Sequence, residues 1–101
     1  MDYKFKFSVI MAVYNVESYL EEAVNSLVNQ TIGFDSIQVI LVDDGSPDNS
    51  GAICDKLKER YPDNIVVVHK ENGGVSTARN EGLKHIEGKY INCMDPDDIL
   101  T

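Results

Sequence analysis

The chain has 101 residues, 43% of them hydrophobic and 26% charged, which is the composition of one ordinary globular domain. Nine Lys and Arg against seventeen Asp and Glu give a formal net charge of −8, which disfavours binding to the phosphates of a nucleic acid. No apolar run approaches the roughly 20 residues of a membrane helix, and no secretory leader opens the chain, so we expect no membrane insertion by this segment. Cys54 and Cys93 lack a CxxC partner and are interpreted as reduced core or surface residues of a cytoplasmic protein.

Strands and helices are predicted to alternate along the chain. Continuous apolar runs rich in β-forming residues predict buried strands, and apolar residues at helical spacing predict helices between them. Ser18 followed by Glu21 has the pattern of a capping box, and Pro62 is expected to end a helix. The predicted elements are a strand over 5–13, a helix over 18–30, a strand over 37–42, a helix over 50–61, a strand over 65–68, a helix over 75–86 and a strand over 90–94.

This alternation predicts an α/β fold with a mostly parallel sheet and helices on both faces. If the first three strands are wound outward in one direction and the fourth returns beside the first, the strand order is 3-2-1-4. That order creates a switch point between the first and fourth strands, where a ligand crevice opens. The last helix is expected to turn an apolar side to the sheet, made of Val75, Ala78, Gly82, Leu83 and Ile86.

Polar residues directly follow three of the predicted strands. They are Tyr14-Asn15, Asp43-Asp44 and Asp95-Pro96-Asp97-Asp98. Because parallel strands end at one edge of the sheet, we expect these segments to converge there. Carboxylates crowded together should either take up protons or bind a cation, and hard oxygen ligands favour Mg²⁺ or Mn²⁺. Each motif alone also has a structural interpretation, as a solvated turn, a helix cap or a packed rim aromatic.

A second candidate feature is the turn Asn72-Gly73-Gly74 before the last helix, whose free amide groups could face an anion. Arg79 follows in the first turns of that helix and could reach a diphosphate. The alternative for Arg79 is a surface ion pair with Glu71 or Glu81. His69 and His85 show no metal-ligand spacing and are interpreted as structural or exposed.

Five motifs together resemble the family 2 glycosyltransferases, in the order of that family and over nearly the whole chain. They are SVIMAVYN (8–15), NQT (29–31), VILVDDGSPDNS (39–50), ENGGVSTARNEGL (71–83) and GKYINCMDPDD (88–98). The resemblance implies a GT-A fold, with residues 1–101 as the N-terminal nucleotide-sugar-binding part of a longer domain. It implies transfer of a sugar, with inversion, from a nucleoside-diphosphate sugar, usually a UDP-sugar, to an acceptor hydroxyl.

The resemblance also implies roles for individual residues. Ala12 and Tyr14 would line the base pocket. Asp44 would bind the uracil edge, with Asp43 nearby. Arg79 would support the nucleotide, and Asp95 would approach the ribose or the ion. The metal ligands, for Mn²⁺ or Mg²⁺, would be Asp97 and Asp98, in a motif that reads DPDD where the family often has a small residue in place of Pro96.

The catalytic base would lie beyond Thr101, so the resemblance predicts that this chain alone does not turn over. The resemblance does not identify the molecule that accepts the sugar. It is consistent with a cytoplasmic protein, or with a full-length enzyme at the inner face of the membrane. The backbone groups along the outer side of the fourth strand are expected to be exposed in this chain, which would favour self-association or low stability.

Four other classes of protein are alternatives to this reading of the sequence. A non-catalytic nucleotide- or metal-binding module would differ only in the residues that come after Thr101. A phosphoacceptor receiver domain would carry acids where Tyr14-Asn15 stands. A dinucleotide dehydrogenase or a sugar-nucleotide pyrophosphorylase would need a Gly-rich loop near the amino end, and residues 13–18 contain no glycine.

Overall fold

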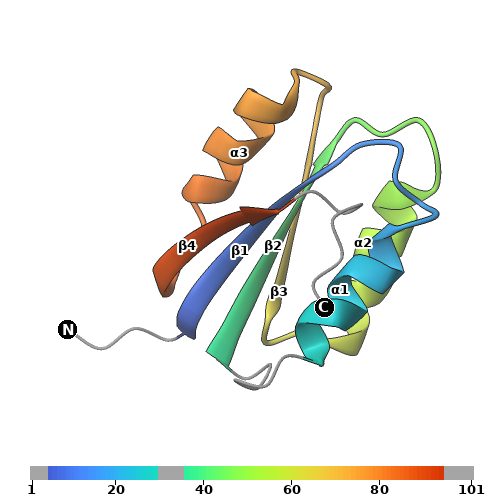
Figure 1. The fold of residues 1–101 in the computed structure, drawn as a ribbon. Coiled ribbons are helices and arrows are strands. Elements are labelled where there is room, and N and C mark those ends of the chain that lie inside the picture. The colour runs from blue at the N-terminus through green and yellow to red at the C-terminus, as the bar shows by residue number, and fades with distance from the viewer. Residues whose placement is uncertain (1–4, 30–35, 95–101) are drawn as a thin grey trace.

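The computed structural model describes residues 5–29 and 36–94, which form a four-stranded parallel sheet with helices on both faces (Figure 1). The sheet order is β3-β2-β1-β4, so the predicted fold class and the 3-2-1-4 order are confirmed. The strands are β1 (Phe5–Val13), β2 (Ile37–Asp44), β3 (Ile65–Lys70) and β4 (Gly88–Met94). The helices are α1 (Leu20–Val28), α2 (Ser50–Arg60) and α3 (Val75–Leu83).

Helices α1 and α2 cover one face of the sheet, and α3 covers the other (Figure 1). Side chains alternate between the faces along each strand, because successive Cβ atoms of a strand point in opposite directions. In β1, Met11 packs with the residues beneath α1 and α2, whereas Ile10 packs with Ala78 of α3. This two-sided burial explains the uninterrupted apolar runs in the sequence.

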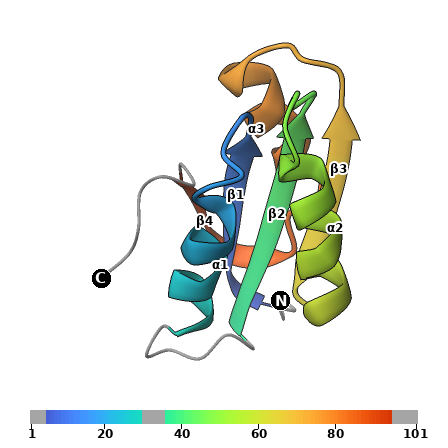
Figure 2. The ribbon, with the colours of Figure 1, turned by 90° about the vertical axis from the view of Figure 1, so that its right-hand side faces the viewer.

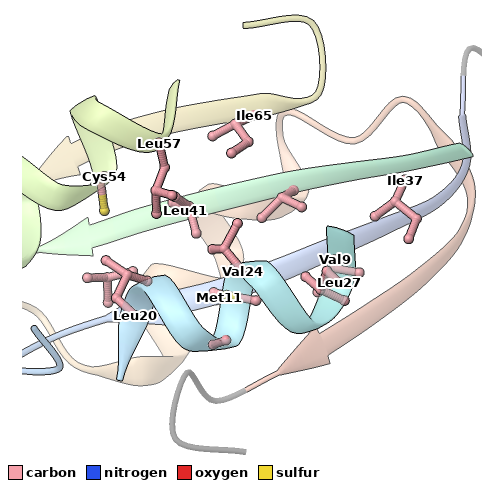
Figure 3. Close-up of a cluster of buried hydrophobic side chains, with 13 residues drawn as sticks. Val9, Met11, Leu20, Val24, Leu27, Ile37, Leu41, Cys54, Leu57 and Ile65 are labelled. Carbon is pink, nitrogen blue, oxygen red and sulfur yellow. The ribbon is translucent and has the colours of Figure 1, made fainter. Parts of the chain in front are cut away.

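The larger core lies between the sheet and the helices α1 and α2 (Figure 3). Leu20 and Leu27 of α1 and Leu57 of α2 are almost fully buried in it. Cys54 also belongs to this core and is fully buried. Burial, together with Asp43 and Asp55 nearby, raises the pKa of its thiol to about 12, so Cys54 stays protonated as a small core residue.

The predicted capping box at Ser18 is not formed, and this prediction is wrong. Helix α1 begins at Leu20, and no side chain caps its first turn. The residues before it form a turn instead, in which Tyr19 N and Leu20 N both donate to Val16 O at 2.9 Å. The neighbouring chain segment 46–50 holds residues 15–17 in this turn, and tertiary contacts thus replace the local cap.

The apolar side predicted for the last helix is partly wrong. Ala78 and Gly82 are buried against the sheet, and Ile86 packs on the same core, but Leu83 is 48% exposed. Helix α3 ends at Leu83, before the predicted Ile86, because the chain turns there toward β4. The close approach of α3 to the sheet depends on Gly82, since a Cβ there would lie 2.6 Å from Ile10 Cγ2.

A buried polar network joins β1, β2 and the start of β4. Ser8 Oγ donates to Gln38 Oε1 at 2.6 Å, and Gln38 Nε2 donates to His85 O at 2.9 Å. Backbone amides complete the network: Glu87 N donates to Gln38 Oε1 and Gly88 N donates to Ser8 Oγ, both at 2.8 Å. These bonds explain the glutamine within an otherwise apolar strand, because each buried polar atom has a partner.

All four strands run in the same direction, and the ends of β1, β2 and β3 lie at one edge of the sheet, beside the start of α3 (Figure 2). In the part of the chain that the structure describes, no helix is both long and apolar enough to cross a membrane.

Candidate functional site

The ends of the three strands β1, β2 and β3 are in register at this edge. Val13 pairs with Asp43, Asp43 with His69, and Asp44 with Lys70. Strands β2 and β3 each extend two residues beyond their predicted ends at 42 and 68, so Asp43 and Asp44 are strand residues and not part of a turn. This extension decides which way the two carboxylates point.

Asp44 lies on the α3 side of the sheet and is 3% exposed. Its Oδ1 accepts hydrogen bonds from Lys70 Nζ at 2.6 Å and from Gly73 N at 3.0 Å, and its Oδ2 accepts one from Gly74 N at 3.0 Å. Burial by itself would raise the pKa of Asp44, but the bonds from Lys70 and the two glycine amides outweigh burial and lower it. Asp44 is therefore an ionised acceptor at neutral pH.

Asp43 lies on the opposite side of the sheet, toward α2. Its Oδ2 is 2.8 Å from His69 Nδ1, and its Oδ1 accepts a hydrogen bond from Ser46 N at 3.1 Å. The other ring nitrogen of His69 is 2.9 Å from Asp55 Oδ1 on α2. The structure thus separates Asp43 from Asp44, although their adjacent positions in the sequence predict one place for both.

The structure describes Asp43 and Asp44 but not Asp95, Asp97 and Asp98, so the expectation that the crowded acids take up protons or bind a cation stays a prediction. Each carboxylate is matched by a basic side chain of β3: Asp43 by His69 and Asp44 by Lys70. The sequence contains this signal, because basic residues end the strand that the 3-2-1-4 order places beside β2. The structural interpretation of His69 is confirmed.

The amides of the loop 72–74 face an anion, as the sequence allows, but this anion is the carboxylate of Asp44. Gly74 has φ +96°, a conformation that favours glycine, and Asn72 Nδ2 donates to Asp44 O at 3.1 Å. Gly45 also has a positive φ of +66°, and a Cβ there would lie 2.7 Å from Asn72 N. The loop is therefore fastened to the end of β2.

Arg79 is exposed on α3, one turn after this loop. The alternative ion pair with Glu71 or Glu81 does not form among the described residues, and Glu81 pairs with Lys84 at 3.1 Å instead. Within this part of the chain the guanidinium is thus not committed to a carboxylate.

Tyr14 follows the end of β1 and is 48% exposed, while Ala12 is half-buried on the α3 side of the sheet. The β1–α1 loop that carries Tyr14 lies beside the β2–α2 loop (Figure 2). Asn15 N donates to Ser46 Oγ at 2.8 Å and Val16 N donates to Ser50 Oγ at 3.0 Å. Asn15 has a positive φ of +54°.

Asp48 lies at the centre of the hydrogen bonds that join the β1–α1 loop to the β2–α2 loop. It accepts hydrogen bonds from Ser46 Oγ, from Ser50 N at 3.0 Å and from Glu17 N at 3.2 Å. Burial opposes ionisation of Asp48, but these bonds outweigh burial and hold its pKa well below the usual range. The sequence alone indicates no role for Ser46, Asp48 or Ser50; the only signal is their place in the motif VILVDDGSPDNS.

Asp95, Asp97 and Asp98 lie outside the described residues. Among the residues that are described, no group of three His, Cys, Asp or Glu side chains is arranged to hold a metal ion. The oxygens of Asp43 and Asp44 are already engaged with His69, Ser46, Lys70 and the glycine amides.

The pairing of His69 predicts a pH dependence of stability. Hydrogen bonds with Asp43 and Asp55 raise the pKa of His69 above its ordinary value of 6.5. A group with a raised folded-state pKa contributes stability that is complete below the unfolded pKa and is lost as the pH rises through the folded pKa. We therefore expect the free energy of unfolding to fall by about 0.5 kcal/mol above pH 6.5, a small change because His69 is 48% exposed.

Urea unfolding at a series of pH values between about 5 and 9 would measure this change, and His69→Gln should flatten the profile. His85→Gln is the matched control for the loss of an imidazole. A wild-type profile that is flat, or that rises with pH, would contradict the assignment.

The motifs match a known family. A family model described as Glycosyl transferase family 2 matches residues 8–101. The minor teichoic acid biosynthesis protein GgaB of Bacillus subtilis (strain 168) is 58% identical over 99 residues, covering 98% of this chain and 11% of GgaB. The minor teichoic acid biosynthesis protein GgaA of the same organism is 46% identical over 98 residues, covering 94% of this chain and 22% of GgaA. The chain therefore spans less than a quarter of either relative.

Solved structures show the same fold. Residues 1–349 of S. aureus TarS, in complex with UDP-GlcNAc, match with a TM-score of 0.83 and 38% identity over 94% of this chain and 27% of that one. The mannosyltransferase PcManGT of Pyrobaculum calidifontis, in complex with GDP-Man and Mn²⁺, matches with a TM-score of 0.85 and 27% identity over 96% and 29%. The family model spans nearly the entire chain, and the fold agrees with that of these structures; the chain belongs to the family 2 glycosyltransferases.

Proposed function

We propose that this chain binds the nucleotide of a UDP-sugar at the α3 side of its sheet edge, as part of an enzyme that transfers the sugar with inversion to an acceptor hydroxyl. The observation that carries the proposal is the placement of Asp44 as a fixed, ionised acceptor beside the start of α3. The match to TarS solved with UDP-GlcNAc supports the choice of donor. The relatives named for minor teichoic acid biosynthesis support a glycopolymer of that class as the product.

Ala12, Tyr14 and Asp44 would form the base pocket. Asp44 is a pure acceptor while ionised, so it suits the N–H of a uracil ring. Tyr14 offers an exposed aromatic face for stacking on the base, and Ala12 is small enough to leave space beside it. Asp43, which faces α2, would support the site through its contacts with Ser46 and His69 and would not touch the base.

Arg79 would support the diphosphate. It is exposed on the helix that begins at the site, and its charge is not neutralised by another side chain within the described residues. A planar guanidinium group can form bidentate hydrogen bonds with phosphate oxygens, which favours Arg over Lys in this role.

A divalent ion, Mn²⁺ or Mg²⁺, would be held by Asp97 and Asp98, with Asp95 near the ribose or the ion. Carboxylate oxygens suit such hard ions, and the family resemblance places the ligands in the DPDD segment, while Asp43 and Asp44 are paired with His69 and Lys70. When bound, the ion would offset the negative charge that develops on the departing nucleotide. The neighbour PcManGT was solved with Mn²⁺.

Calorimetric titration of UDP tests this proposal. We expect wild-type protein to bind UDP about tenfold more tightly with Mn²⁺ than without it, a difference of about 1.4 kcal/mol. Asp97→Ala should remove this gain and leave the metal-free affinity largely unchanged, because the ion acts through that carboxylate.

Asp63→Ala is the matched control, since Asp63 is an exposed carboxylate before β3, at the opposite edge of the sheet. It should bind UDP like the wild type with and without the ion. Absence of UDP binding by the wild type would overturn the nucleotide site. Binding that ignores both Mn²⁺ and Asp97→Ala would overturn only the metal assignment.

A further inference from the structure

Lys70 has all its hydrogen-bonding capacity committed inside the protein. Its ammonium group donates to Asp44 Oδ1 and Glu71 O, each at 2.6 Å, and to Thr77 Oγ1 at 3.3 Å. An ammonium group has three N–H donors, so these acceptors use all of them. The side chain is 21% exposed, against 4% for that of Asp44. Lys70 is therefore not free to bind a phosphate, and it acts on a nucleotide only through Asp44.

The hydrogen bonds of Asp44 leave one acceptor position open among the described residues. Oδ1 already accepts from Lys70 and from Gly73, which uses both of its lone pairs. Oδ2 accepts only from Gly74 within the same part of the chain, so it retains one lone pair. Counting the described residues alone, Oδ1 is filled, so the carboxylate can take one additional donor, at Oδ2.

A single acceptor that is fixed opposite ring position 3 distinguishes the two pyrimidines. Uracil carries an N–H at ring position 3, which can donate to Oδ2. Cytosine has an unprotonated nitrogen at the same position, and its lone pair would face the lone pair of a negatively charged oxygen. A buried polar group that is hydrogen-bonded by one base has no partner when the other base is bound, and this loss lowers the affinity for the second base.

We propose that Lys70 is a positioning residue that fixes the Asp44 carboxylate with one open acceptor and thereby sets the preference for uridine over cytidine nucleotides. The inference rests on the proposed function, since it assumes that Asp44 meets the base. If Lys70 only stabilised the loop 71–77, its loss would weaken the binding of both nucleotides alike. Base discrimination therefore separates a positioning role from a structural one.

The test compares UDP and CDP in calorimetric titrations of the wild type, Lys70→Met and Lys70→Arg, each without added metal. Lys70→Met keeps the length of the side chain but removes its charge and its donors. We expect it to weaken UDP binding about tenfold and to affect CDP binding much less, so that the UDP/CDP affinity ratio falls about tenfold. Lys70→Arg retains the positive charge and the donors, so it should keep most of the wild-type UDP/CDP affinity ratio.

Lys84→Met is the matched control, because Lys84 forms an exposed ion pair with Glu81 just after α3 and should leave the ratio unchanged. Circular dichroism verifies that each variant is folded. If Lys70→Met does not fold, Lys70→Gln retains a neutral donor and should lower the ratio by an intermediate amount.

The outcomes separate the two proposals. A wild type that binds neither nucleotide overturns the proposed function and this inference with it. A wild type that prefers UDP, together with folded Lys70 variants that keep the full preference, overturns the inference alone. An equal loss of UDP and CDP affinity in a folded variant assigns Lys70 a structural role and also overturns it.

Discussion

Replacing Asp44 with alanine is expected to lower the free energy of unfolding by about 3 kcal/mol and to weaken UDP binding about 100-fold. Asp44 is 3% exposed, and its carboxylate accepts three hydrogen bonds, from Lys70, Gly73 and Gly74. Alanine would leave a half-buried ammonium without its counter-charge and two amides without an acceptor. Removing one partner of a buried pair costs more than the pair contributes, because the other charge stays desolvated.

Urea unfolding followed by circular dichroism measures the loss of stability, and calorimetry measures the loss of affinity. Asp63→Ala, which removes an exposed carboxylate outside the site, serves as the control for both. The double variant Asp44→Ala with Lys70→Met should recover part of the stability, because it removes the orphaned charge, but none of the affinity. A stability loss below about 1 kcal/mol for Asp44→Ala would contradict the role of the pair.

The substitution Gly88→Ala is expected to destabilise the fold by about 2–3 kcal/mol, the upper part of the usual range for overpacking of a well-packed position. A Cβ at Gly88 would lie 2.5 Å from Ser8 Oγ and 2.7 Å from Phe7 C and Ser8 N. Two of these atoms belong to the backbone of β1 and cannot rotate away. The start of β4 would therefore move from β1, and the hydrogen bond from Gly88 N to Ser8 Oγ, 2.8 Å long, would break.

Urea unfolding of Gly88→Ala measures this effect. The control is Lys89→Ala, the next residue on β4, which is exposed and should change the free energy of unfolding by less than about 0.5 kcal/mol. Equal stability of Gly88→Ala and the wild type would show that the start of β4 can move without cost, and would contradict a role for close packing at Gly88.

Much of the fold follows from the sequence because its signals are local. Buried strands of a parallel sheet are apolar on both faces, so β1 to β3 appear as continuous apolar runs. The 3-2-1-4 order is predicted on the condition that the fourth strand returns beside the first, and the structure meets that condition. Local signals fail where another segment replaces them. Ser18 has the spacing of a cap, yet the turn before α1 is held by Ser46 and Ser50, which are distant in the chain.

The features of the candidate site also fall into those that the sequence predicts and those that depend on the folded structure. The motifs of the chain predict a polar edge and a glycosyltransferase family, and the family is confirmed. The separation of Asp43 from Asp44 follows from strand alternation, but only once β2 is known to reach Asp44. A strand that ends at Val42 leaves both carboxylates in a turn with no defined direction.

The α/β class, the family and the polar character of the sheet edge can be predicted from the amino-acid sequence, because periodicity and motif order are properties of the linear chain. The balance of charges at that edge depends on contacts that form only in the folded chain. The register of β2 with β3 places His69 beside Asp43 and Lys70 beside Asp44, on opposite faces of one sheet. Hydrogen bonds and ion pairs act over a few ångströms of space, and their partners here are 26 residues apart in the chain.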